Sequence, residues 1–99
     1  MSLGSPTPRD FDKLLNHASE ISGIPMTSFL EKGRGSQRLS QWRMAVFYIL
    51  RNAGATFHEI GSYFNRDYST VIHGCKVLDS KSSDAQVRDI ISKLSTYNK

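Results

Sequence analysis

Apolar residues recur at intervals of three and four along most of the chain, which is the spacing of one face of an α-helix. The first helix is predicted over residues 9–22 and ends at Gly23, because glycine commonly follows a helix end. A short helix is expected over 25–30. A longer one is expected over 37–53, with Ser36 as its N-cap.

The second half of the chain contains a pair of helices joined by a tight turn. Thr56–Glu59 fits a capping box, in which a threonine and the glutamate three residues later satisfy each other's backbone N–H groups. Asn65 tolerates the left-handed backbone that a tight turn requires. Asp67 can then cap a helix that begins at Tyr68 and continues to about Leu78.

The last predicted helix starts at a second capping-box pattern, residues 83–86, and has an apolar stripe that reaches Tyr97. No stretch alternates with period two for long enough to predict a sheet, so the expected fold is all-α with about six helices. Residues 1–8 hold small residues and two prolines and are expected to form a flexible segment. The remaining residues, 9–99, are long enough for one domain.

Charge is concentrated in one part of the sequence. The chain carries 13 basic and 9 acidic residues, for a net charge of +4. Residues 31–51 hold five basic residues against one acidic residue, and this surplus equals the whole net charge. A localised basic segment indicates a polyanionic partner, most often nucleic acid, although a solvated basic helix face is the alternative. The basic residues are Lys32, Arg34, Arg38, Arg43 and Arg51, and the acidic one is Glu31.

Several classes of protein are disfavoured by what the sequence lacks. The longest apolar stretch, Met44–Leu50, is far shorter than the roughly 20 residues that span a bilayer. The start of the chain has no apolar core of the kind found in signal peptides. The single cysteine excludes an internal disulfide and favours a reducing, cytoplasmic setting. No phosphate-loop pattern is present, so no ATP site is expected.

Metal binding and catalysis find little support in the residue types. His17, His58, His73 and Cys75 are the candidate metal ligands, but His73 and Cys75 fall on different faces of one helix and no second pair completes a tetrahedron. Cys75 is expected to be a small buried residue, and Trp42 a core residue. We therefore expect neither a cofactor nor an enzyme.

Residues 56–78 have the layout of a helix-turn-helix, a short capped helix followed by a tight turn and a second helix. The second helix of this motif lies in the major groove of DNA, where its first residues meet the base edges. Hydroxyl groups there can donate or accept hydrogen bonds. Asp67 has two interpretations, since its carboxylate can accept from a cytosine amino group or cap the helix, and the cap is the more common role. The residues placed at this position are Arg66, Asp67, Tyr68, Ser69 and Thr70.

The same segment closely resembles a known signature. Residues 59–75 read Glu-Ile-Gly-Ser-Tyr-Phe-Asn-Arg-Asp-Tyr-Ser-Thr-Val-Ile-His-Gly-Cys. The C-terminal DNA-binding domain (domain IV) of the bacterial replication initiator DnaA has Glu-Ile-Gly, an aromatic residue, and then Gly-Gly-Arg-Asp-His before Ser or Thr and Thr-Val. The resemblance covers about residues 9–97 and is strongest over 56–78.

The resemblance implies a Trp-repressor-like helical domain that binds duplex DNA carrying a DnaA box. By position, it implies that residues 66–70 read the major groove and that Arg34 or Arg38 enters the minor groove from the basic loop, which also contains Lys32. Arg43 and Lys76 would contact phosphates, which fix the register without reading sequence.

Three positions depart from the family pattern. Tyr68 replaces a histidine, which is expected to change base preference because tyrosine is longer and cannot become cationic. The turn is one residue shorter, with Asn65 alone. Gly74 replaces an alanine at a cost of about 1 kcal/mol in helix propensity, and this glycine can allow two helices to pack closely.

The function expected from the sequence is sequence-specific binding of duplex DNA by a monomeric domain, as in replication initiation. Two alternatives stay open. The chain can be a DNA-binding module of a mobile element or of a transcription regulator. It can also be a helical protein-interaction domain that does not bind DNA.

Overall fold

The structure, a computed structural model, describes residues 8–31, 35–81 and 84–95, and these residues form six α-helices and no strand. This result confirms the all-α prediction. The predicted flexible segment lies outside the described residues except for Pro8, which is the first residue of the first helix. The helices are α1 (Pro8–Ser22), α2 (Met26–Leu30), α3 (Gln37–Asn52), α4 (Phe57–Tyr63), α5 (Tyr68–Ser80) and α6 (Ala85–Ser95).

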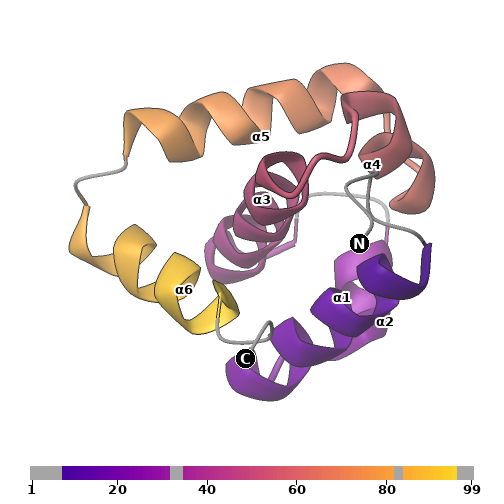
Figure 1. Cartoon of the computed structure of the whole chain (residues 1–99). Helices are drawn as coiled ribbons and strands as arrows, with labels where there is room; N and C mark the ends of the chain where they lie inside the picture. The colour runs from indigo at the N-terminus through magenta and orange to yellow at the C-terminus, as the bar shows by residue number, and fades with distance from the viewer. Residues whose placement is uncertain (1–7, 32–34, 82–83, 96–99) are drawn as a thin grey trace, which may run out of the picture.

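Helix α3 lies in the centre of the molecule, and the other helices are arranged around it (Figure 1). Its apolar positions face several neighbours, so six of its apolar residues are buried, together with Arg43. Trp42 is among them, which confirms its predicted place in the core. The most deeply buried large side chains come from every helix of the bundle: Leu14, Leu15, Phe29, Val46, Phe47, Leu50, Ile60, Phe64, Val71 and Leu94.

Two of the predicted helix starts are formed as the sequence indicates. The Ser36 hydroxyl accepts the N–H of Leu39 at 3.1 Å and caps α3. At α4, Thr56 Oγ1 accepts the N–H of Glu59 at 3.0 Å, while Glu59 Oε1 accepts the N–H of Thr56 at 2.8 Å. Both capping predictions are therefore confirmed, because each depends only on residues within one turn.

The last helix starts differently from the prediction. Asp84 Oδ1 accepts the N–H groups of Gln86 at 2.8 Å and Val87 at 3.3 Å, so a carboxylate caps α6. Ser83, the predicted cap, lies outside the described residues, as does Tyr97. An aspartate at this position also complements the positive end of the helix dipole.

The turn between α4 and α5 approaches α4 very closely. Asn65 has a φ of 55°, which confirms its predicted left-handed backbone. The N–H of Arg66 then donates to the Gly61 carbonyl at 2.8 Å. A Cβ atom on Gly61 would lie 2.8 Å from the Arg66 carbonyl oxygen, so this position has room only for glycine.

Helix α5 packs closely on α3 at Gly74. A Cβ atom on Gly74 would lie 3.1 Å from Met44 Cγ and 3.2 Å from Phe47 Cδ2. The Phe47 ring also meets the Phe64 ring edge-to-face, with centroids 5.0 Å apart. Gly74 therefore allows the close packing that the sequence suggested, and Phe47 contacts residues from both sides of the helix-turn-helix.

Helix α1 is held against the end of α4 by Tyr63. Its ring meets Phe11 edge-to-face at 5.1 Å, and its hydroxyl donates a hydrogen bond to Asp12 Oδ1. Burial, together with this bond, raises the pKa of Tyr63 above its ordinary value. Tyr63 is thus a packing residue that joins α1 to the end of α4.

The Gly61→Ala variant is expected to lower the free energy of unfolding by about 1–2 kcal/mol, because forcing the turn away from α4 costs more than the added helix propensity contributes. Urea denaturation followed by circular dichroism measures this change. Ser62→Ala, at an exposed neighbouring position of α4, is the matched control and is expected to change little. An unchanged midpoint for Gly61→Ala would contradict the close approach.

Candidate nucleic-acid interface

The first turn of α5 presents a group of polar side chains to solvent. Asp67, Tyr68, Ser69 and Thr70 are all exposed. The Ser69 hydroxyl donates to Asp67 Oδ2 at 2.9 Å. Asp67 occupies the N-cap position, but its carboxylate accepts no backbone N–H of the helix. The prediction that its side chain caps α5 is therefore wrong, and the carboxylate is oriented by Ser69 instead.

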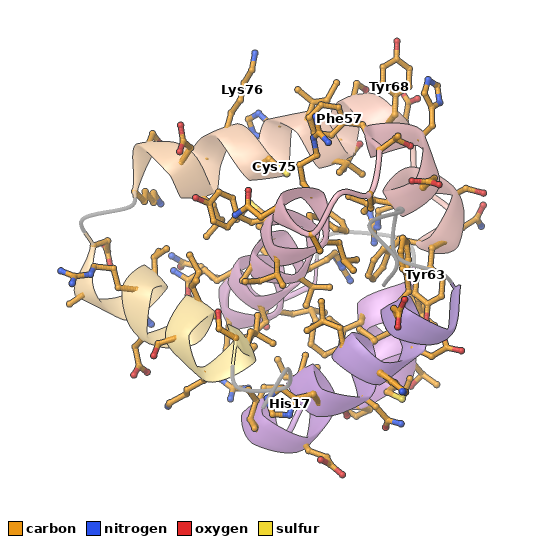
Figure 2. The ribbon with its side chains drawn as sticks, viewed as in Figure 1. His17, Phe57, Tyr63, Tyr68, Cys75 and Lys76 are labelled. Carbon is orange, nitrogen blue, oxygen red and sulfur yellow. The ribbon has the colours of Figure 1, made fainter. Side chains whose placement is uncertain are left out.

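Tyr68 projects from the surface at the start of α5, with its hydroxyl directed away from the bundle (Figure 2). It is 45% exposed, the most exposed of the large apolar side chains described. Its ring stacks on His58, with centroids 4.5 Å apart and an angle of 29° between the rings. His58 lies in the first turn of α4, so the stack joins the starts of both helices of the motif.

A groove of about 500 Å³ runs between α3 and α5, beside this first turn. Both walls of the groove carry polar or basic residues, and α3 adds the apolar Met44 and Phe47. The polar and basic lining residues are Ser40, Arg43, Arg66, Thr70 and His73. The hydroxyl of Thr70 and the ring of His73 come from the same face of α5, three residues apart.

Arg43, a predicted phosphate contact, is only 5% exposed. Its Nε donates to the Phe29 carbonyl at 3.1 Å and its Nη2 donates to the Ser28 carbonyl at 2.9 Å. The guanidinium therefore satisfies carbonyl groups at the end of α2 that have no partner within that helix. Burial lowers the pKa of Arg43, as does the neighbouring charge of Arg66.

Arg66, predicted among the residues that read bases, is half-buried and lines the groove together with Thr70. Its Nη2 donates a hydrogen bond to the carbonyl of Glu31, directly after α2. Arg43 and Arg66 thus bind three backbone carbonyl groups of one short segment, those of Ser28, Phe29 and Glu31. This contact fixes the start of the basic loop next to the turn of the helix-turn-helix.

The other predicted DNA-binding residues are dispersed. Arg38 donates to the Ser22 carbonyl at the end of α1 and lines a separate hollow between α3 and α6, away from the first turn of α5. Lys76 is exposed and its side chain extends outward from α5 (Figure 2). Lys32 and Arg34 lie outside the described residues.

The remaining candidate residues have ordinary environments. Cys75 is half-buried, and burial raises the pKa of its thiol. His73 is exposed. Among the parts of the chain that the structure describes, no group of three or more His, Cys, Asp or Glu residues is placed to hold a metal ion.

His58 is part of this surface, although the sequence indicated it only as a candidate metal ligand. The capping box places His58 in the first turn of α4. The short turn after α4 then brings the start of α5, at Tyr68, close to that first turn. These two signals together were sufficient to predict that the two rings lie close to each other.

The six helices, with a tightly joined pair and an exposed polar first turn on the second of them, define a helix-turn-helix domain. Residues 11–77 match the family model described as "Bacterial dnaA protein helix-turn-helix". The chain belongs to this family of DNA-binding domains, which confirms the resemblance found in the sequence.

A curated relative agrees with this assignment. The chromosomal replication initiator protein DnaA 1 of Chlamydia pneumoniae is 20% identical over 93 residues, which cover 88% of this chain. The chain spans about a fifth (20%) of the length of that relative. None of the helices described here is both long and apolar enough to cross a membrane.

The Arg43→Lys variant is expected to lower the free energy of unfolding by about 1–3 kcal/mol, because one ammonium cannot reproduce the two bonds to Ser28 and Phe29 from a buried position. Thermal or urea unfolding measures the loss. Arg88→Lys, an exposed position on α6, is the matched control with little expected effect. Equal stability of the two variants would show that the bonds at α2 contribute nothing.

Proposed function

We propose that this chain binds duplex DNA sequence-specifically, with the first turn of α5 in the major groove, as part of replication initiation at DnaA-box sequences. The observation that carries the proposal is the cluster of exposed polar side chains, residues 67–70, at the start of the second helix of the motif. The second helix of such motifs enters the major groove with its N-terminal end against the bases. The match to a helix-turn-helix family supports DNA binding by this motif.

The groove between α3 and α5 suits a phosphate of the DNA backbone. Arg43 and Arg66 bring two positive charges together at its wall, and the charge of one lowers the pKa of the other. An anion in the groove relieves this repulsion. Thr70 and His73 line the groove and add donors for phosphate oxygens. Arg43 and Arg66 thus contribute to the field around the phosphate while they hold the end of α2.

The minor-groove contact is assigned to Arg34. The resemblance left a choice between Arg34 and Arg38. Because the Arg38 guanidinium is bonded to the Ser22 carbonyl on another side of the molecule, Arg34 is the better candidate of the two. The Arg66 bond at Glu31 supports this assignment, because it ties the start of the basic loop to the helix-turn-helix. Arginine is favoured in narrow minor grooves by their strong negative potential.

The role in replication initiation is inferred from the relative, whose name describes a chromosomal replication initiator. Since this chain spans a fifth of that protein, the proposal covers the DNA-binding step alone. The step takes place where the bacterial chromosome is, in the cytoplasm.

Fluorescence anisotropy with a duplex that contains a DnaA box, compared with a scrambled duplex of equal composition, tests the proposal across a salt series. A preference for the box that persists at moderate salt supports DnaA-type recognition. Equal and steeply salt-dependent binding to both duplexes contradicts box recognition while keeping DNA binding. No binding to either duplex overturns the proposal and favours a protein-interaction domain.

Two variants separate base reading from phosphate binding. Thr70→Ala is expected to cost about 1–3 kcal/mol of binding free energy on the preferred site and much less on the scrambled duplex, because a lost base contact affects one sequence. Lys76→Ala is expected to weaken binding to both duplexes alike and to reduce the slope of log K against log salt by about one unit.

The same anisotropy titrations measure both effects, and each variant serves as the control for the other. An equal loss on both duplexes for Thr70→Ala would exclude direct reading of a base by Thr70. A loss confined to the preferred site for Lys76→Ala would exclude a pure phosphate contact.

A further inference from the structure

The stack of Tyr68 on His58 is an unusual feature of the exposed surface. Both side chains are exposed, yet their rings stack, with centroids 4.5 Å apart and an angle of 29° between the ring planes. The two residues come from the first turns of different helices, ten positions apart in the sequence. The contact therefore depends on the tight turn that contains Asn65 and on the close approach of that turn to Gly61.

The stack restricts a side chain that would otherwise rotate. An exposed tyrosine at a helix start populates several χ1 rotamers, and each rotamer sends its hydroxyl to a different place. Contact of one face of the ring with His58 favours a single rotamer, in which the hydroxyl extends away from the bundle (Figure 2). A hydroxyl fixed in advance loses less conformational entropy when it binds a partner.

The position of this hydroxyl matters for DNA reading. Tyr68 is the first residue of α5, and it lies between Asp67 and Ser69 in the polar cluster. In the proposed complex this point of the helix is closest to the base edges. A phenolic hydroxyl can both donate and accept a hydrogen bond, so its placement determines which base edge it meets.

We propose that His58 is a positioning residue for sequence recognition, which holds the Tyr68 ring by stacking so that the Tyr68 hydroxyl contacts a base edge in the major groove. This inference rests on the proposed function. It assigns no DNA contact to His58 itself. The aromatic ring of residue 58 performs the positioning, so another aromatic ring at that place replaces it.

The test uses the whole chain and a duplex selected by the wild-type protein from a randomised pool, so that no binding site has to be assumed. Anisotropy gives the ratio of affinities for the selected duplex and its scrambled counterpart. His58→Ala is expected to reduce this ratio by about two- to tenfold, the range that an aromatic stack contributes. His58→Phe is expected to keep it within about twofold, because the stack remains.

Tyr68→Phe keeps the stack but removes the hydroxyl, so we expect it to reduce the ratio as well. The double variant His58→Ala with Tyr68→Phe is expected to lose no more than Tyr68→Phe alone, since His58 acts only through the hydroxyl. His17→Ala is the matched control, because His17 lies at the opposite end of the molecule from Tyr68 (Figure 2). It is expected to leave the ratio unchanged.

Proton NMR of the free protein provides a reading that does not depend on DNA. The ring protons of Tyr68 are expected to show a ring-current shift in the wild type and in His58→Phe, and to lose it in His58→Ala. Loss of the shift without any change in the affinity ratio overturns the positioning role while leaving DNA binding intact.

Two other results also overturn the positioning role. Equal losses for His58→Phe and His58→Ala mean that the imidazole itself contacts DNA. Additive losses in the double variant mean that the two side chains act independently. If the wild type selects no duplex at all, the proposed function fails, and the positioning role fails with it.

Discussion

The contact of the Phe47 ring with Gly74 and Phe64 determines how the helix-turn-helix is held against the rest of the bundle. Phe47 belongs to the central helix α3. Of its two partners, Phe64 directly follows α4 and Gly74 lies within α5. A single buried ring thus sets the distance of both helices of the motif from the rest of the bundle. Because protein interiors are packed as densely as organic crystals, such a contact fixes positions to within fractions of an ångström. The first turn of α5 therefore has a defined place relative to the groove and to α2.

A second level of organisation is electrostatic. Two guanidinium groups, Arg43 and Arg66, are kept close to each other by bonds to carbonyl groups from Ser28 to Glu31. Carbonyl oxygens at a helix end carry partial negative charge, so they offset part of the repulsion between the arginines. The arrangement affects both the fold and the surface. The two side chains that bind the carbonyl groups at the end of α2 also make one wall of the groove positive. A substitution of either residue is therefore expected to affect both the end of α2 and the charge of the groove.

The parts of the structure that depend on neighbouring residues could be predicted from the sequence. Ser36, Thr56 with Glu59, and Asn65 behave as expected, because a cap or a turn is decided within four residues. The environment of Arg43 could not be predicted in this way, since its partners lie 14 and 15 positions away and are brought near only by packing. The same holds for Arg66, whose partner is 35 positions away. The prediction that Asp67 caps α5 failed for a local reason. The Ser69 hydroxyl and the backbone N–H groups of α5 compete for the Asp67 carboxylate, and the Ser69 hydroxyl binds it.

The bond from Ser69 to Asp67 has a consequence for the polarity of the surface. A serine hydroxyl has one proton, and here that proton is directed at the Asp67 carboxylate. Because both residues are exposed, the lone pairs of Ser69 and the remaining carboxylate oxygen of Asp67 are left as acceptors at this corner of the protein. In a major groove, acceptors match the exocyclic amino groups of cytosine and adenine and oppose the N7 and O6 atoms of guanine. A hydrogen bond between two neighbouring side chains thus converts a neutral, ambivalent hydroxyl into a group with a fixed chemical preference.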